Sequence, residues 1–306
     1  MTRRLTWILL VLLLAIGLPY YWLLLDNSGA TLPAKPITIA ELRRLAATIP
    51  GEAPYAVEVE RAAFRRVPGN LMVAGAGMKR ELIGYMAFRL LVRGGRPVMI
   101  ESGITPAIAA AQSAEQFNLS AQARIDRALD EASLILVTHE HPDHLGALAA
   151  HGGSALLQAA WLNPRQVPPA GMAAKLPWRG AAPPPRLNGT ALQAVAPGVV
   201  VIPAPDSHTP GSQLIYVRLA DDRELLFAGD NASFAQNWQE LRGRSRLVGT
   251  WFAPENRAEV FAWIKTIRAL KVQAPGLLVV PGHDWEWLNN PENHTGVRIG
   301  FSPTKD

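Results

Sequence analysis

The segment from His139 to His144 constrains the fold more than any other feature of this sequence. It reads His-Glu-His-Pro-Asp-His and directly follows residues 133–138, a short apolar run typical of a buried strand. His139 and His141 are two positions apart, so in an extended chain both point to the same side. Asp143 and His144 follow where the chain turns toward a helix. The pattern therefore predicts a metal site at a strand end, with ligands for two adjacent positions.

Three later residues complete the predicted site. His208, Asp230 and His283 each follow a predicted strand, and those strands lie at about residues 198–202, 224–228 and 276–280. Loops that rigid strands hold in place are the usual positions of functional residues. We therefore expect these three side chains to lie beside the first four.

Composition excludes several other chemistries. The 306 residues include no cysteine, which rules out disulfides, zinc–thiolate sites and cysteine nucleophiles. Hydrophobic residues make up 49% of the chain and charged residues 18%, which argues against long disordered regions. The net charge is +5, and Arg3 and Arg4 supply two of the positive charges. The remainder is too weakly basic to indicate a nucleic-acid partner.

Leu5 to Leu25 is an uninterrupted run of uncharged, mostly apolar residues, long enough to span a bilayer as a helix. Two arginines precede it, and Tyr20, Tyr21 and Trp22 lie near its far end, as in an interfacial aromatic belt. We predict that residues 1–25 form a transmembrane anchor. The positive-inside rule then places the catalytic domain outside the cytoplasm.

Two other interpretations of this run stay open. It could be a secretion signal, cleaved at Ser28-Gly29-Ala30, although it is long for a signal peptide. It could also be a buried structural helix.

Strands and helices alternate along the rest of the chain, which predicts an α/β (α+β) fold. Residues 26–54 form a predicted linker and short amphipathic helix, in which Thr38 and Glu41 fit a capping box and the helix stops at Pro50-Gly51. Residues 55–306 form the predicted catalytic domain. Further strands are expected at about 55–62, 86–92, 97–100 and 213–219, and longer helices at about 120–131 and 254–270.

Two segments have no clear place in this pattern. Residues 163–186 contain seven prolines in 24 positions, which indicates either a surface insertion or a lid in which Trp178 covers part of the site. Arg242, Arg244 and Arg246 form a basic cluster. We interpret this cluster as a solvated face, with phosphate or carboxylate binding as the alternative.

The order of the predicted ligands resembles the metallo-β-lactamase superfamily. The motif His139-x-His141-x-Asp143-His144 is followed by His208, Asp230 and His283, and the resemblance covers roughly residues 55–290. It implies a four-layer αβ/βα sandwich, with metal ions at one edge between two sheets.

The resemblance also implies how the ligands are shared between two ions. The first ion would be bound by His139, His141 and His208, the second by Asp143, His144 and His283, and both by Asp230. Two zinc ions are expected, with iron or manganese as alternatives. The implied reaction is hydrolysis of a small ester, lactone, thioester or phosphodiester by a hydroxide between the ions. Asp143 would be the catalytic residue that orients the hydroxide or accepts a proton.

Within this superfamily, the sequence argues against several activities. Asp230 is present and cysteine is absent, unlike in true β-lactamases. Acyl-homoserine lactonases carry a tyrosine three residues after the bridging aspartate, where this chain has Ser233. The alternative reaction is that of a mononuclear-iron sulfur dioxygenase, which would use only His139, His141, His208 and Asp230. Either reaction implies a small-molecule substrate, and the sequence does not indicate an oligomeric state.

Overall fold

Two β-sheets form the centre of the protein in a computed structural model that describes residues 3–303. The first two residues of the predicted anchor and the last three of the predicted catalytic domain lie outside this range. The first sheet contains β1 (Ala56–Pro68), β2 (Arg80–Leu91), β3 (Val98–Ile100), β4 (Gln116–Phe117), β5 (Leu134–Leu136) and β11 (Arg298–Ile299). The second contains β6 (Gln193–Ala196), β7 (Val199–Pro203), β8 (Gln213–Arg218), β9 (Glu224–Gly229) and β10 (Leu278–Pro281).

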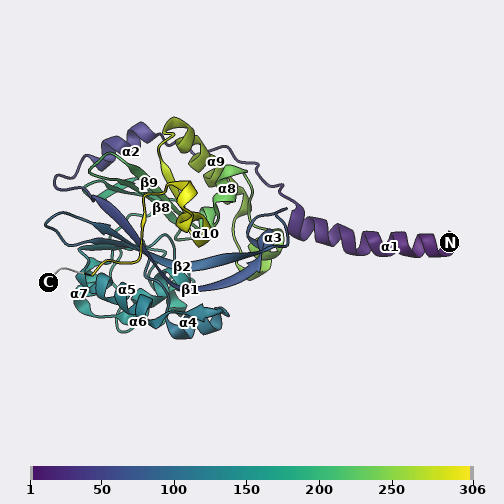
Figure 1. The fold of residues 1–306 in the computed structure, drawn as a ribbon, viewed down its shortest axis with the longest axis horizontal. Helices are drawn as coiled ribbons and strands as arrows, with labels where there is room; N and C mark the ends of the chain where they lie inside the picture. The colour runs from purple at the N-terminus through teal and green to yellow at the C-terminus, as the bar shows by residue number, and fades with distance from the viewer. Residues whose placement is uncertain (1–2, 304–306) are drawn as a thin grey trace.

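Helices cover the outer faces of both sheets (Figure 1). The α-helices are α1 (Arg3–Tyr20), α2 (Ile39–Ala46), α3 (Gly69–Met72), α4 (Pro106–Ala111), α5 (Leu119–Glu131), α6 (Pro142–His151), α7 (Ser154–Ala159), α8 (Ala235–Gln239), α9 (Arg257–Gln273) and α10 (Trp285–Asn289). Shorter helical turns are η1 (Tyr21–Leu25), η2 (Ala173–Lys175), η3 (Asp230–Ala232), η4 (Val248–Phe252) and η5 (Pro291–Asn293).

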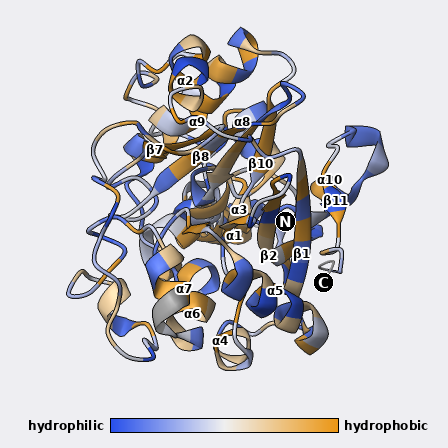
Figure 2. Ribbon diagram, turned by 90° about the vertical axis from the view of Figure 1, so that its left-hand side faces the viewer, coloured by the Kyte–Doolittle hydropathy of each residue, from blue (hydrophilic) through white to orange (hydrophobic). Residues whose placement is uncertain are grey.

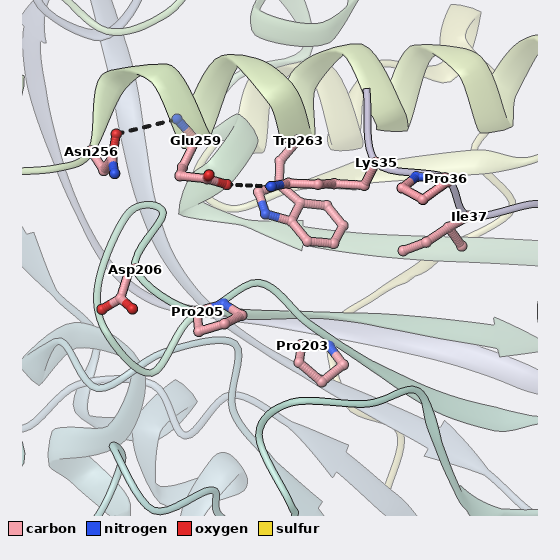
Figure 3. Close-up of a pocket in the computed structure, with 9 residues that line it drawn as sticks. All are labelled: Lys35, Pro36, Ile37, Pro203, Pro205, Asp206, Asn256, Glu259 and Trp263. Carbon is pink, nitrogen blue, oxygen red and sulfur yellow. Dashed lines mark hydrogen bonds and ion pairs between the residues drawn. The ribbon is translucent and has the colours of Figure 1, made fainter. Parts of the chain in front are cut away.

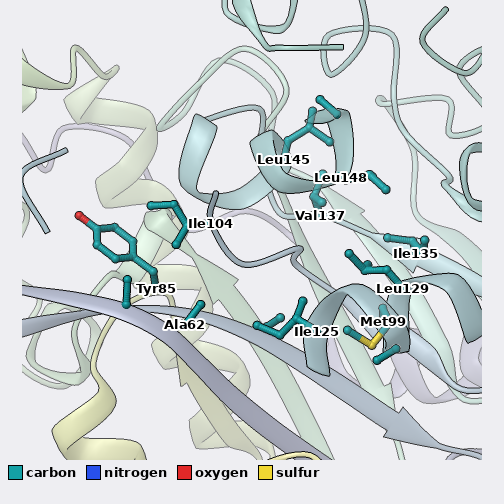
Figure 4. Packing of buried hydrophobic residues seen from close by; sticks show 14 of the residues in the cluster. Ala62, Tyr85, Met99, Ile104, Ile125, Leu129, Ile135, Val137, Leu145 and Leu148 are labelled. Carbon is teal, nitrogen blue, oxygen red and sulfur yellow. The ribbon is translucent and has the colours of Figure 1, made fainter. Parts of the chain in front are cut away.

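Three hydrophobic clusters fill the spaces between four layers. One lies between the first sheet and α5 and α6, and Figure 4 shows Ile125, Leu129 and Leu145 in it. A second packs α2 and α9 against the second sheet, and a third fills the space between the sheets, where Phe88 meets Phe227. The hydropathy colouring follows the same layers, with apolar strands at the centre (Figure 2). The four-layer sandwich that the resemblance implies is therefore confirmed.

The two sheets differ in strand order, and each places predicted strands side by side. The first runs in the order β11-β1-β2-β3-β5 with β4 paired to β1, and the second runs β10-β9-β8-β7-β6. β1 and β2 are longer than the predicted strands because they pair along their whole length, from Ala56 opposite Leu91 to Pro68 opposite Arg80. The β3–β5 and β9–β10 pairs are parallel. The loops that follow these strands therefore come out at one edge of the sandwich.

Residues 26–38 run along the surface of the second helical layer. Thr38 accepts a hydrogen bond from the amide of Glu41, as the capping box predicts, although α2 ends at Ala46, before Pro50. Figure 3 shows Lys35 and Glu259 meeting beside Trp263, with 2.6 Å between the ammonium and the carboxylate. The segment therefore lies against α9.

The apolar helix projects away from the sandwich (Figure 1). Arg3–Leu25 is long and apolar enough to cross a membrane, and a signal sequence would pass the same test. None of its most apolar window is buried inside the protein, which contradicts the interpretation as a buried structural helix. The helix meets the domain at its last turn, where the amide of Gly75 donates to the carbonyl of Leu24 at 3.0 Å.

The proline-rich segment 163–186 contains one short helical turn, η2, and is held by buried side chains. Trp178 packs against the cluster beneath the first sheet and donates to the carbonyl of Ala173 at 2.8 Å. It therefore does not cover the predicted site. Met172 is the residue of this segment that lines the cavity at the site.

Candidate metal centre

The first four predicted ligands come from the β5–α6 connection. His139 lies three residues beyond the end of β5, and His141 is the N-cap of α6 with extended backbone angles. Pro142 begins the helix, where its fixed φ and missing amide donor are tolerated. Asp143 and His144 therefore lie in the first helical turn and point differently from the two preceding histidines.

The other three come from the second sheet. His208 lies between β7 and β8, Asp230 directly follows β9, and His283 lies two residues beyond β10. Two glycines allow the close approach of these loops. A Cβ on Gly229, whose φ is +51°, would lie 2.6 Å from the Thr138 side chain, and a Cβ on Gly282 would lie 2.7 Å from the Asp230 carboxylate. Any larger residue at either position would push the two ligand loops apart.

The structure brings all seven predicted residues together as two clusters. In the first, Nδ1 of His141 lies 3.0 Å from Nε2 of His139 and 3.1 Å from Nε2 of His208. Oδ2 of Asp230 is 3.3 Å from Nε2 of His208. The fourth member of the cluster is therefore a carboxylate oxygen that faces three imidazole nitrogens.

The second cluster contains Asp143, His144 and His283. Nε2 of His144 lies 3.4 Å from Nε2 of His283, and Oδ2 of Asp143 lies 3.8 and 3.6 Å from these two nitrogens. Oδ1 of Asp230 is 3.0 Å from Nε2 of His283. The two oxygens of Asp230 thus face different clusters.

These spacings fit metal ions. Ligand atoms about 2.0–2.1 Å from a tetrahedral zinc ion lie roughly 3.3 Å from one another. Neighbouring donor atoms lie 3.0 to 3.8 Å apart and all donor atoms of a cluster lie within 4.8 Å of one another, which is close to the spacing around such an ion. Charge supports the same conclusion, because Asp143, Asp230, Glu101 and Glu255 lie in or directly behind the clusters with Arg244 as their one buried arginine partner. Buried carboxylates in excess need cations.

Several ring nitrogens that face away from the clusters have polar neighbours. His283 donates from Nδ1 to the carbonyl of Gly84 at 2.9 Å, which leaves its Nε2 free as a ligand. Nδ1 of His208 lies 3.0 Å from Glu255, and Nδ1 of His144 lies 3.2 Å from Glu101. Carboxylate and carbonyl partners of this kind fix the ring orientation and raise the basicity of metal-binding histidines.

Glu101 supports both clusters from the end of β3. Its carboxylate faces His144 directly and accepts a 2.5 Å hydrogen bond from the hydroxyl of Thr138, whose oxygen lies 3.1 Å from Nδ1 of His139. The φ of Glu101 is +65°, a left-handed conformation that costs a residue with a side chain about 1–3 kcal/mol. The fold therefore holds Glu101 in a strained position that lets one carboxylate orient a histidine of each cluster.

The protonation states suit metal binding. Burial lowers the pKa of His139 well below its usual value, and burial and the nearby His208 lower that of His141 to about 3, so both rings are neutral. Burial raises the pKa of Asp230, but the charges of Arg244 and His283 outweigh this effect and hold it well below its usual value. Burial likewise opposes ionisation of His144, yet Glu101 and Asp143 raise its pKa to about 9. A metal ion there would displace a proton.

Arg244 corrects our interpretation of the basic cluster as a solvated face. Its side chain is buried, and its guanidinium lies 2.6 Å from Oδ2 of Asp230 and contacts the hydroxyl of Ser233. Arg242 donates to the carbonyl of Ala74, and Arg246 pairs with Asp26 at 2.6 Å. Of the three arginines, one therefore enters the site and two hold neighbouring chain segments.

A cavity of about 540 Å³ opens beside the clusters. Its polar lining residues include His141, Asp143, Asp230, Arg244 and His283. Its other lining residues include Val67, Leu71, Met72, Met172, Val248 and Phe252. Tyr85 of β2 also lines it, with its ring edge against His283 and a buried hydroxyl that has no hydrogen-bond partner within residues 3–303.

Tyr85, Glu101 and Glu255 were not predicted from the sequence, and Arg244 was named only within the basic cluster, with carboxylate binding as the alternative. Glu101 carried a usable signal, because it is a carboxylate that directly follows the apolar strand β3, as the other site residues follow theirs. Glu255 and Tyr85 carried none. Glu255 lies just before α9 and Tyr85 lies inside β2. Only the packing of α9 and β2 brings these two residues to the site.

Comparison with solved structures supports the fold. A quorum-quenching N-acyl homoserine lactone lactonase superimposes with a TM-score of 0.59 at 14% identity, covering 78% of this chain and 95% of the lactonase. An N-acyl homoserine lactone hydrolase with N-hexanoyl-L-homoserine at its metal centre gives 0.57 at 14% identity, covering 77% and 96%. A probable metal-dependent hydrolase from Staphylococcus aureus gives 0.56 at 10% identity, covering 77% and 91%.

Sequence comparison identifies the family. No curated protein sequence matches the chain significantly. The sequence model of the metallo-beta-lactamase superfamily, however, matches residues 89–283, which is more than half of the chain and includes both ligand clusters. The chain therefore belongs to the metallo-β-lactamase superfamily of metal-dependent hydrolases.

Proposed function

We propose that this protein is a dinuclear metallo-hydrolase that cleaves a small ester, lactone, thioester or phosphodiester. The observation that carries the proposal is the position of Asp230, whose two carboxylate oxygens face two separate clusters of ligand atoms. A mononuclear dioxygenase would need only the first cluster. The second cluster is also largely buried, with the Glu101 carboxylate 3.2 Å from His144 and the carbonyl of Gly84 bound to His283, which favours two ions.

In this proposal His139, His141 and His208 would hold one ion, Asp143, His144 and His283 would hold the other, and Asp230 would offer one oxygen to each. Zinc is the ion that we expect, because the donors are imidazole and carboxylate groups at tetrahedral spacing. When bound, such ions lower the pKa of water to about 7 and polarise the oxygen of a carbonyl or phosphoryl group.

Asp143 handles the proton. Its carboxylate accepts a 3.1 Å hydrogen bond from the side chain of Gln112, which fixes its orientation at the cavity wall. Burial raises its pKa, but the charges of His144 and His283 outweigh burial and keep the pKa below its usual value. Asp143 is therefore ionised near neutral pH, and it can accept a proton from the attacking water and pass it to the leaving group.

Tyr85 supplies a donor to the substrate. Its hydroxyl is buried at the cavity and unpaired within the described residues, and an unpaired buried hydroxyl is costly unless a ligand satisfies it. Ser233, three residues after the bridging aspartate, instead donates to Asp230 at 3.1 Å. We propose that Tyr85 donates to the oxygen on which charge develops during hydrolysis.

We further propose that Arg3–Leu25 remains as a membrane anchor, with the catalytic domain outside the cytoplasm. The chain just beyond the helix is bound to the domain, which supports an anchor over a cleaved signal. Arg257 donates to the carbonyls of Asp26 and Ser28, and Asn27 bonds with the backbone of Leu241 and Gly243. Cleavage after Ala30 would remove all of these contacts.

A substrate panel with controlled metal content tests the proposed function. The purified chain is stripped with a chelator, reloaded with zero, one or two equivalents of zinc, iron or manganese, and assayed on esters, lactones, thioesters and phosphodiesters. We expect hydrolysis of one class that rises steeply only with the second equivalent. Full activity with one iron per chain, measured as oxygen consumption on a persulfide, would show that the dioxygenase alternative is correct.

A further inference from the structure

We infer that the cavity at the metal centre opens toward the membrane surface, and that the substrate is an acyl ester or related amphiphile taken directly from the bilayer. The inference rests on the hydrolase and the anchor proposed above and adds to them the source and class of the substrate. It is carried by the way in which the end of the apolar helix is joined to the rim of the cavity.

The helix and the domain are joined without a spacer. The apolar run ends at Leu25, and the domain already binds the chain at Leu24 through the amide of Gly75. Since a helix rises about 1.5 Å per residue, the domain surface around Gly75 lies within a few ångströms of the end of the membrane-spanning stretch. Arg246 lies 5.4 Å from the ring of Trp22, at the level where an aromatic belt meets lipid headgroups.

The same two segments that bind the helix end form the rim of the cavity. η1 packs against α3, whose Leu71 and Met72 line the cavity. The segment 241–252 contacts Asp26 and Asn27 at its beginning, carries Arg244 into the metal site, and ends with Val248 and Phe252 on the cavity rim. In Figure 1 the helix leaves the domain at the end where α3 lies. The cavity therefore opens close to the membrane.

The rim carries the side chains that insert into a bilayer surface. Trp251 is 58% exposed and Phe252 is 75% exposed, and both lie in or beside η4. Met78, 59% exposed, lies in the connection between β1 and β2 next to the exposed Lys79. Exposed aromatic residues with a nearby cation are typical of surfaces that dip into the headgroup layer of anionic membranes.

The occupant that fits this opening is an amphiphile with its acyl tail toward the bilayer. The lining of the cavity also includes apolar side chains that suit methylene groups, namely Val67, Leu71, Val248 and Phe252. The polar bond to be cleaved would lie at the clusters, between Asp143 and Tyr85. In the reaction, water adds its oxygen to the acyl carbon, the bond to the alcohol oxygen breaks, and a carboxylate and an alcohol leave.

A depth measurement tests the orientation without any assay of activity. The chain has no cysteine, so Phe252→Cys and Trp251→Cys each give one site for a nitroxide spin label in the full chain, reconstituted in phosphatidylcholine–phosphatidylglycerol vesicles. Val272→Cys is the matched control, since Val272 is 74% exposed and lies about 22 Å further along α9 from Arg257. We expect the labels at 251 and 252 to be accessible to oxygen and shielded from a water-soluble nickel chelate, and the label at 272 to be the reverse. Nickel accessibility at 251 and 252 equal to that at 272 would overturn the inference.

A comparison of two esters tests the substrate class. The zinc-loaded full chain in the same vesicles is given 4-nitrophenyl butyrate in water or 4-nitrophenyl palmitate in the bilayer. We expect kcat/KM for the palmitate to exceed that for the butyrate by about tenfold or more, and this ratio to fall about tenfold in a Trp251→Ser/Phe252→Ser variant but not in Val272→Ser. Metal-dependent hydrolysis with no preference for the bilayer ester overturns the inference and leaves the hydrolase intact. Absence of hydrolysis across the whole panel overturns the proposed function instead, and the spin labels still decide the orientation.

Discussion

Asp230 has the largest role of any single residue in the proposed site. It follows Gly229 at the end of β9, presents one oxygen to each cluster, and is bound by Arg244 and Ser233. Glycine is needed at position 229, because the Cβ of any other residue there would collide with Thr138. One carboxylate thus links the two sheets through the ions that it would bridge.

Replacing ligands one at a time should separate the two sites. Asp230→Ala should lower the content of both ions, because both clusters lose an oxygen, while His283→Ala should mainly empty the second. We expect hydrolysis to fall about 100-fold in each, which corresponds to about 2.7 kcal/mol of transition-state stabilisation. Elemental analysis and kcat/KM measure both effects. His151→Ala is the control, since His151 pairs with Asp130 on the surface. Normal metal content in Asp230→Ala would contradict the shared site.

Tyr85→Phe tests the proposed oxygen donor. Removing the hydroxyl leaves the ring contact with His283 and the packing of β2 unchanged, so metal content and thermal stability should stay as they are. We expect kcat to fall by about tenfold to 100-fold, or roughly 1.4–2.7 kcal/mol, with a smaller change in KM. Tyr55→Phe, at an aromatic residue that contacts Arg93 instead, is the matched control. An unchanged kcat for every hydrolysed substrate would remove Tyr85 from the mechanism.

At the scale of elements, the ends of strands position the site and the helices hold it from behind. α9 begins at Arg257, two residues after Glu255, which orients His208. β2 contributes the carbonyl of Gly84 to His283 and the side chain of Tyr85 to the cavity. α2 lies on the far side of the second sheet, where Arg43 pairs with Glu224 of β9, the strand that leads to Asp230.

The Arg43–Glu224 pair predicts a pH-dependent contribution to stability. Burial raises the pKa of Glu224, but hydrogen bonds from Arg43 and Tyr216 outweigh burial and lower it below 4.5. An acid whose pKa is lowered by folding stabilises the protein above its unfolded pKa and loses this effect as the pH falls through the folded pKa. Arg43→Gln should therefore lower the free energy of unfolding at pH 7 by up to about 1 kcal/mol, since the arginine is partly exposed.

The difference between wild type and Arg43→Gln should shrink as the pH falls below about 4.5 and vanish below the lowered pKa of Glu224 in the folded wild type, where both proteins carry a protonated Glu224. Urea unfolding at pH 7 and at low pH measures the difference. Arg44→Gln is the control, because the structure shows no ion pair for this neighbouring arginine among residues 3–303. A difference that stays constant with pH would show that Arg43 stabilises α2 by packing alone.

At the scale of the whole molecule, the apolar helix and the catalytic domain form a continuous arrangement. Asp26, Asn27 and Ser28 are bound by arginines and backbone groups of the domain, and Lys265 donates to the carbonyls of Ala30 and Leu32. The linker is therefore fixed along its length, so the helix and the domain should keep their relative orientation.

A topology experiment tests the anchor. A reporter that is active only outside the cytoplasm, fused after Asp306, should be active, and the fusion should stay with membranes in high salt and at alkaline pH. Arg3→Glu/Arg4→Glu should reduce the exported fraction, because the positive-inside rule depends on these charges. Release of a shortened protein into the soluble fraction, with an N-terminus near Ala30, would instead establish a cleaved signal.

Local sequence patterns predicted a mixed α/β fold and the seven residues of the two clusters, and the resemblance of these residues to a known family implied the four-layer sandwich. Apolar runs fix buried strands, and His139, His141, Asp143 and His144 are contiguous, so their proximity needs no tertiary information. The sequence also allowed us to predict His208, Asp230 and His283, because each follows a strand and strand ends share one edge of the sandwich. Boundaries were less accurate where pairing extends a strand, as in β1 and β2.

Only the tertiary structure decided which polar groups support the site and where the cavity opens. Arg244 looks like a surface arginine in sequence, and it is buried because η4 and α9 fold it against Asp230. Tyr85 and Glu255 are brought to the site by contacts between β2, β10 and α9, which are far apart in the chain. A sequence pattern reports which face of a strand or helix is apolar. The partner that covers this face depends on long-range packing, and so does the position of the cavity rim beside the helix end.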